Sequence, residues 1–134
     1  MGVRKGFNLT EHSGLLPFLG SGPSKSTAGS GFYTVEDYTA ILKHAVKHYV
    51  TVLPEFDMPG HAHAAIKSME ARAQRLAGEN KPTAAGQFLL SDQEDMSKYI
   101  SAQLFNDNAM NPCLESTYLF VEHLIEQTVE MHKV

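Results

Sequence analysis

Apolar residues recur at helical spacing from residue 34 onward. Thr34 is a typical helix N-cap, and Asp37 three residues later completes a capping-box pattern with Asp in place of the usual Glu. The apolar positions that follow repeat about every 3.6 residues, and they are Val35, Tyr38, Ile41, Leu42, Ala45, Val46 and Tyr49. The pattern predicts an amphipathic helix that begins at Thr34 and buries one stripe.

A different pattern follows at Val50 to Leu53, where apolar and β-branched residues are consecutive. Such a run is typical of a strand that is buried on both faces. Pro54 cannot donate a ladder hydrogen bond, so we expect regular pairing to stop there. Side chains alternate along a strand, and one face is therefore expected to be shared by Thr51, Leu53, Glu55 and Asp57.

Helical spacing returns twice further along the chain. One predicted helix covers 62–76, with Gly78 as its end signal. The last covers 115–132 after an Asn111-Pro112 opening, with a stripe formed by Leu114, Tyr118, Val121, Ile125 and Val129. The region between them has weaker periodicity, and short extended pieces are predicted at 88–90 and 101–105.

The order helix, strand, helix with short connections is typical of an α/β fold. The chain has 134 residues, enough for one domain, and we divide it into a loop region at 1–31 and the predicted elements at 32–134.

The net charge of −4 comes without a basic stripe, which argues against a nucleic-acid partner. No apolar run approaches the roughly 20 residues of a membrane span. Cys113 is the single cysteine, and we expect a buried thiol there.

Candidate chemistry lies at the end of the predicted strand. Glu55 and Asp57 follow its apolar half, and ligands of α/β proteins bind at the carboxyl ends of strands. Spacing alone equally fits two acids that only brace a loop. His61 and His63, and likewise His44 and His48, are spaced as possible metal ligands. A metal centre needs further ligands in fixed geometry, so we favour an exposed polar pair at His44 and His48, disfavour a metal site at His61 and His63, and expect no metal and no cofactor.

Three stretches carry a family resemblance. The run PEFDMPGHAHAAI resembles the PEIDMPGH signature of glycoside hydrolase family 20, the β-N-acetylhexosaminidases, which include the chitobiases. The longer run GFYTVEDYTAILKHAVKHYVTVLPEFDMPGH is similar to the helix and third strand of that family's barrel. The run LFNDNAMNPCLESTYLFVEHLIEQTVEMHK is similar to the segment and helix that follow. The resemblance extends from about Gly6 to Val134.

The resemblance implies a fold, which is a partial (β/α)₈ TIM barrel. A complete barrel takes roughly 250 residues, so the chain is expected to be a fragment with about one and a half βα units plus long loops. The implied reaction is hydrolysis of terminal non-reducing N-acetylhexosamine residues from chitobiose or glycans. It retains configuration because the acetamido group of the substrate itself assists. The implied partner is an oligosaccharide ending in N-acetylglucosamine or N-acetylgalactosamine, and the implied location is secreted, periplasmic or lysosomal.

The resemblance also implies roles for three residues. His61 falls on the histidine of the PGH signature, which supports the general acid within a hydrogen-bonded Asp–His–Glu arrangement. Asp57 and Glu55 are implied only as members of that network. The family's acid and its stabilising Asp lie in a motif His-x-Gly-Gly-Asp-Glu, which this sequence does not contain. We therefore expect the 134-residue chain alone to be inactive. The alternative is a non-catalytic remnant that binds a glycan or a protein partner.

Overall fold

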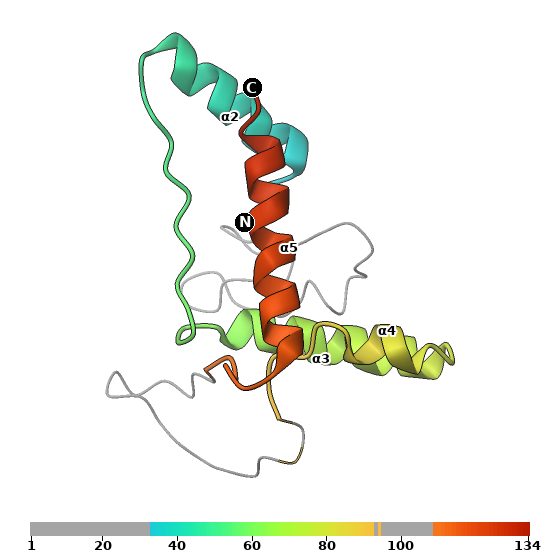
Figure 1. Ribbon diagram of the computed structural model, residues 1–134. Coiled ribbons are helices and arrows are strands. Elements are labelled where there is room, and N and C mark those ends of the chain that lie inside the picture. Colours follow the sequence, from blue (N-terminus) through green and yellow to red (C-terminus); the bar gives the residue numbers. More distant parts are fainter. Residues whose placement is uncertain (1–32, 93, 95–108) are drawn as a thin grey trace, which may run out of the picture.

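The computed structural model describes residues 33–92, 94 and 109–134, and helices are its regular elements (Figure 1). In chain order they are α2 (Val35–Lys47), α3 (His63–Gly78), α4 (Pro82–Gly86) and α5 (Glu115–Met131). The three helices predicted from periodicity are confirmed with small differences at their ends. The short helix α4, which begins at a proline, was not predicted.

The predicted capping box at the start of α2 is confirmed. The hydroxyl oxygen of Thr34 accepts a hydrogen bond of 3.0 Å from the backbone N–H of Asp37. The carboxylate of Asp37 accepts one of 2.9 Å from the backbone N–H of Thr34 in return. This reciprocal pair satisfies backbone donors that a helix start leaves without intrahelical partners.

Both α2 and α3 end in a left-handed residue that is not glycine. Tyr49 has φ 58° after α2, and Asn80 has φ 57° after α3. The N–H of Val50 donates to the carbonyl of Ala45, and the N–H of Tyr49 donates to that of Val46, which is the Schellman pattern. Gly78, predicted as the end signal of α3, is instead its last helical residue.

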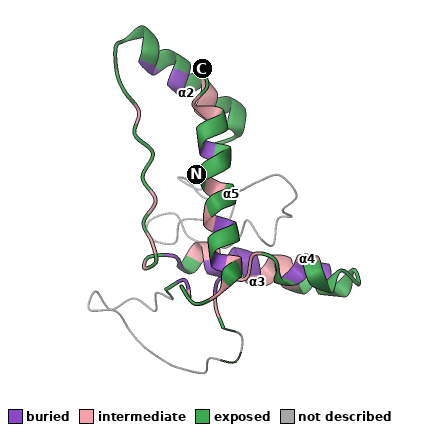
Figure 2. Cartoon of the chain, in the orientation of Figure 1, coloured by how far each residue is buried: buried purple, intermediate pink, exposed green. Residues whose placement is uncertain are grey.

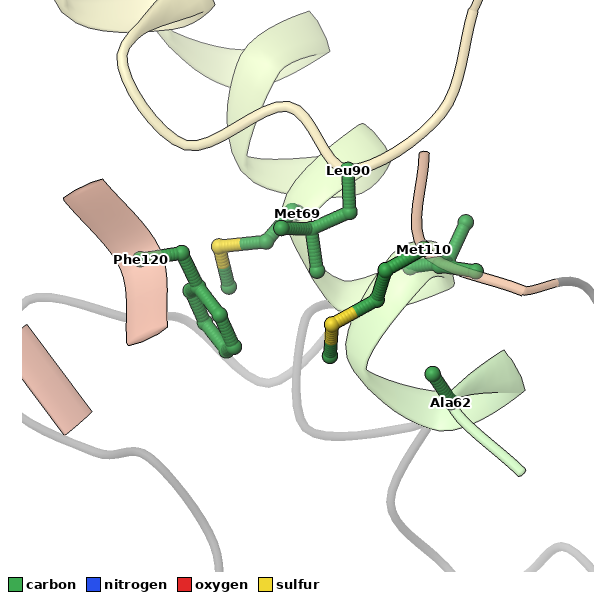
Figure 3. Packing of buried hydrophobic residues seen from close by; sticks show 6 residues of the cluster. Ala62, Met69, Leu90, Met110 and Phe120 are labelled. Carbon is green, nitrogen blue, oxygen red and sulfur yellow. The ribbon is translucent and has the colours of Figure 1, made fainter. Parts of the chain in front are cut away.

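A small apolar core lies where the start of α5 meets α3. Figure 2 shows the buried residues gathered at this junction, and Figure 3 shows their side chains pointing toward one another. The helix α4 is held against α3 by Arg72, whose Nη1 donates a hydrogen bond of 2.7 Å to the carbonyl of Ala84. The core comprises Ala62, Ile66, Met69, Leu90, Met110 and Phe120.

The face that α5 buries differs from the predicted stripe. Tyr118, Ile125 and Val129 were expected inside, yet they are 58%, 46% and 55% exposed. The buried positions of α5 are Thr117, Phe120 and Thr128. Each threonine hydroxyl donates to a backbone carbonyl, so its burial leaves no unpaired donor. Of the predicted stripe, Val121 packs against the core and Leu114 is half-buried, so periodicity located the helix and only part of the side that faces the core.

Helix α2 lies against the C-terminal end of α5 (Figure 1). A hydrogen bond of 2.9 Å joins the hydroxyl of Tyr38 to Nε2 of His132, which directly follows α5. Within the predicted stripe of α2, Leu42 and Ala45 are buried, whereas Val35 and Val46 are 51% and 62% exposed. The predicted stripe is therefore only partly covered.

The predicted buried strand at Val50 to Leu53 is wrong for the described residues. The segment runs extended from α2 to α3 (Figure 1), but it forms no strand there, and Val50 and Leu53 are 56% and 83% exposed. A strand requires a partner to receive its backbone hydrogen bonds, and no ladder is present in the described ranges. The α/β expectation of a partial barrel with one and a half βα units is consequently not confirmed by these residues.

Three smaller expectations also have outcomes. The extended piece predicted at 88–90 is a turn leading into a buried loop residue, Leu90. The piece predicted at 101–105 and the loop region at 1–31 lie outside the described residues. Cys113 is exposed rather than buried. Among the helices described, none has the length and apolar character needed to cross a membrane.

Candidate active-site segment

The candidate site residues follow one another on the segment that enters α3. Glu55 and Asp57 are exposed, whereas Phe56 and Met58 between and after them are half-buried. This alternation agrees with the prediction that the two acids share a face. Because both carboxylates lie at the surface, their charges need no buried counter-charge.

His61 lies two residues before His63, the first residue of α3, in a left-handed conformation. Its φ is 51°, and its side chain is exposed, while the next residue, Ala62, is 4% exposed. A residue with a Cβ in this region is strained by about 1–2 kcal/mol, and such strain persists only where the surroundings impose it. The imidazole of His61 is therefore exposed to solvent, while the backbone that follows it is fixed by the buried residue Ala62.

The segment that contains Met110 and Asn111 is hydrogen-bonded to this turn. The backbone N–H of Met110 donates a hydrogen bond of 2.9 Å to the carbonyl of Pro59, two residues before His61. The adjacent N–H of Asn111 donates one of 2.8 Å to the carbonyl of Leu90. The side chain of Met110 also packs in the same core as Ala62 (Figure 3). The turn is thus anchored both by a backbone hydrogen bond and by side-chain packing.

The structure places Glu55, Asp57 and His61 along one solvent-exposed stretch. Imidazole and carboxylate groups can exchange protons with a bound substrate or with a neighbouring acid. A complete glycosidase site needs a positioned acid and a second group that stabilises positive charge. The described residues supply two carboxylates and an imidazole at the surface of this segment.

No cluster of three or more His, Cys, Asp or Glu residues with metal-binding geometry occurs in the described part of the chain. His61 and His63 flank the start of α3, and each has an interaction within the structure. This set does not provide the several protein ligands that a structural or catalytic zinc site requires.

Sequence reasoning did not single out the residues that hold the turn. Met110 and Leu90 lie in a region of weak periodicity, and they are 5% and 1% exposed. Leu90 follows Leu89 and Met110 follows Ala109, and each precedes a polar residue, which is only a weak local signal for burial. Their backbone hydrogen bonds depend on contacts across the sequence and leave no local pattern.

Comparison with known proteins places nearly the whole chain in one family. The family model described as "Glycosyl hydrolase family 20, catalytic domain" matches residues 6–134. Beta-hexosaminidase B of Pseudoalteromonas piscicida is 42% identical over 132 residues, which are 98% of this chain and 17% of that protein. N,N'-diacetylchitobiase of Vibrio harveyi is 42% identical over 134 residues, 99% of this chain and 15% of that protein. The chain thus spans about one sixth of the length of these relatives.

A solved structure resembles the arrangement of the helices. It is the crystal structure of an inactive mutant of the GH20 exo-β-N-acetylglucosaminidase from Vibrio harveyi. The TM-score is 0.60 at 31% identity, and the match covers 78% of this chain and 14% of that one. At this identity the likeness extends to the family as well as to the fold.

Proposed function

The chain belongs to glycosyl hydrolase family 20, whose catalytic domain is a TIM barrel, and we propose that it is a segment of a β-N-acetylhexosaminidase. The proposed reaction removes terminal non-reducing N-acetylhexosamine residues from chitobiose or glycans. The observation that carries the proposal is the family match over residues 6–134, which includes the exposed turn at His61. Relatives named beta-hexosaminidase and N,N'-diacetylchitobiase support the same substrate class.

The proposed mechanism is substrate-assisted and retains configuration at the anomeric carbon. The acetamido oxygen of the substrate attacks that carbon while a general acid protonates the leaving sugar oxygen. We assign His61 the task of orienting the acid, with Asp57 and Glu55 as further members of the hydrogen-bonded network. The side chain of His61 is exposed, and its turn is anchored by a backbone hydrogen bond. These two facts support the assignment, because a residue that orients a catalytic acid must itself be held in place by the backbone.

The proposed architecture is a partial (β/α)₈ barrel of about one and a half βα units. In it, residues 32–134 supply helix, strand, helix and a later helix. The extended but unpaired segment at 50–53 supports this proposal, since a barrel would pair it on both sides. The uncovered residues Val46 and Tyr118, 62% and 58% exposed, fit helices that pack on neighbouring elements. A secreted, periplasmic or lysosomal location belongs to the same proposal.

A second candidate function is binding to a protein partner without catalysis. The apolar positions left exposed on α2 and α5 favour it, because surfaces of this kind mark interaction sites. The coding sequence on both sides of this segment discriminates between the two functions. An open frame that encodes the His-x-Gly-Gly-Asp-Glu strand supports the enzyme, and an interrupted frame supports the remnant.

The experiment is a segment exchange. Residues 6–134 replace the matching segment of the Vibrio harveyi chitobiase, and the hybrid and the isolated 134-residue chain are assayed with an aryl N-acetyl-β-glucosaminide. The hybrid is expected to turn over the substrate, and the isolated chain is not. A folded hybrid without activity would overturn the proposal that this segment is catalytically competent.

A further inference from the structure

A pair of histidines lies on the exposed side of α2, away from the candidate active-site segment. The rings of His44 and His48 have centroids 4.4 Å apart and are tilted by 37°. Both residues are exposed. They are four positions apart, a spacing that places two side chains on the same helix face. We propose that these two imidazoles chelate one divalent first-row transition ion, with water completing its coordination.

The ring geometry suits a two-nitrogen chelate. Zinc binds imidazole nitrogen at about 2.0–2.1 Å, so a tetrahedral ion needs two ligand nitrogens about 3.3 Å apart. The ring centroids are 4.4 Å apart, and the proposal requires rotation about the side-chain torsions to bring one nitrogen of each ring to that separation. Imidazole is a ligand that suits Zn²⁺, Ni²⁺ and Cu²⁺ rather than Mg²⁺ or Ca²⁺.

The position of the histidine pair at the C-terminal end of α2 favours binding of a cation. His44 lies in the last turn of α2, and His48 is its C-cap residue. The C-terminal end of a helix carries partial negative charge, which stabilises a cation there. The Schellman bonds from Tyr49 and Val50 fix the backbone around His48 before any ion arrives. Exposure means that the ion keeps its remaining water ligands, so little desolvation opposes binding.

The charges nearby set the strength of the site. Lys43 and Lys47 each precede one of the histidines, and they oppose an incoming cation. The proposed site is therefore an open chelate of modest affinity, in contrast to the closed four-ligand sites that hold structural zinc. Two imidazoles on one helix nevertheless bind far better than one, because the second ligand is already at high effective concentration.

The test is a titration of the 134-residue chain with Zn²⁺, followed by calorimetry and by the histidine ring signals in NMR spectra. Wild type is expected to bind with the largest shifts at His44 and His48. The variants His44→Ala and His48→Ala are expected to bind at least about tenfold more weakly. Circular dichroism of each variant verifies that the helix remains.

A composition-matched control isolates the geometry. The double change Lys43→His with His44→Lys keeps the number of histidines and the net charge, but it moves the two imidazoles to different faces of α2. The proposal expects this variant to bind as weakly as His44→Ala. Wild-type affinity in the double variant, or largest shifts at His61 and His63, would overturn it. The same holds if wild type shows no zinc binding at all.

Discussion

The backbone N–H of Met110 donates a 2.9 Å hydrogen bond to the carbonyl oxygen of Pro59, which joins the loop before α5 to the turn that carries His61. The same methionine is 5% exposed and packs in the core beside Ala62. One residue thus links the core of the helical junction to the position of the candidate site.

Truncation of Met110 is expected to destabilise this junction. Met110→Ala removes a buried side chain and should lower the free energy of unfolding of the junction by about 2–5 kcal/mol. Met110→Leu keeps the volume and should cost less than about 1.5 kcal/mol. Amide exchange of α3 and of the start of α5 in the 134-residue chain, expressed as protection factors, measures both locally. Equal effects of the two substitutions would contradict the packing role.

The capping box makes the start of α2 sensitive to acid. The backbone N–H of Thr34, and to a lesser extent its hydroxyl, donates to Asp37 and lowers the pKa of that carboxyl below its ordinary value of 3.8. A depressed pKa in the folded state means that the stabilisation is present above pH 3.8 and is lost as the pH falls further, through the folded pKa. The protection factors of the amides in the first turn of α2, taken relative to the intrinsic exchange rate at each pH, should fall over that range. Asp37→Asn is expected to flatten the dependence.

Thr34→Ala tests the other half of the same box. The substitution removes the acceptor of the Asp37 N–H and should weaken the start of α2 by about 1 kcal/mol. Thr34→Ser retains the hydroxyl oxygen and serves as the matched control. Amide exchange at Asp37 and Tyr38 reports the loss locally, and similar protection in the alanine and serine variants would show that the cap contributes nothing.

The left-handed residue after α2 offers a stabilising change. Tyr49 has φ 58° and a side chain that is 100% exposed, so the aromatic ring contributes no packing there. Tyr49→Gly should remove about 1–2 kcal/mol of backbone strain, partly offset by the greater flexibility of glycine in the unfolded chain. Asn80→Gly, at φ 57° after α3, should gain less because asparagine tolerates this conformation. Helicity and amide exchange at Val50 and Lys81 compare the two sites.

Local rules explain what the sequence predicted well. The capping box at Thr34 depends on atoms within three residues, and it is present as expected. The extents of α2, α3 and α5 follow from the 3.6-residue period and agree closely with the structure. The resemblance carried by PEFDMPGH also reached the correct family, because that run combines several unusual residues in fixed order.

Long-range contacts explain what the sequence predicted poorly. Val50 to Leu53 has the composition of a buried strand, but a strand forms only with partners, and the segment is exposed here. The stripe of α5 was assigned to Tyr118 and Val129 by hydrophobicity, whereas Thr128 is buried because its hydroxyl bonds to the carbonyl of Leu124. No local pattern marks Met110 as the residue that holds the turn at Pro59.

The isolated chain is expected to be marginally stable. Its uncovered apolar residues and the unpaired segment at 50–53 leave surface that water solvates poorly. Scanning calorimetry should therefore give a broad, weak transition, and light scattering should reveal association. A sharp cooperative transition in a monodisperse monomer is the result that contradicts this expectation.

The two histidines at the start of α3 are expected to differ in the segment-exchange hybrid. His61 lies in the left-handed turn of the candidate active-site segment, whereas His63 is the first residue of α3. If His61 orients the general acid, His61→Ala should lower kcat about 10²-fold or more with a smaller change in KM. The acidic limb of the pH–rate profile should also shift, because the environment of the acid changes. His63→Ala should leave both quantities near those of the unsubstituted hybrid.

The comparison also needs a control for the strained backbone of His61. His61→Asn keeps a hydrogen-bonding side chain and tolerates a left-handed φ of 51°, so a loss caused only by strain should not appear in it. An orienting role predicts partial activity in His61→Asn and a profile between those of wild type and His61→Ala. An unchanged kcat and acidic limb in His61→Ala would remove His61 from the site. Equal losses in His61→Ala and His63→Ala would assign the pair a shared folding or metal-binding role, and metal analysis of the purified hybrid would separate those two.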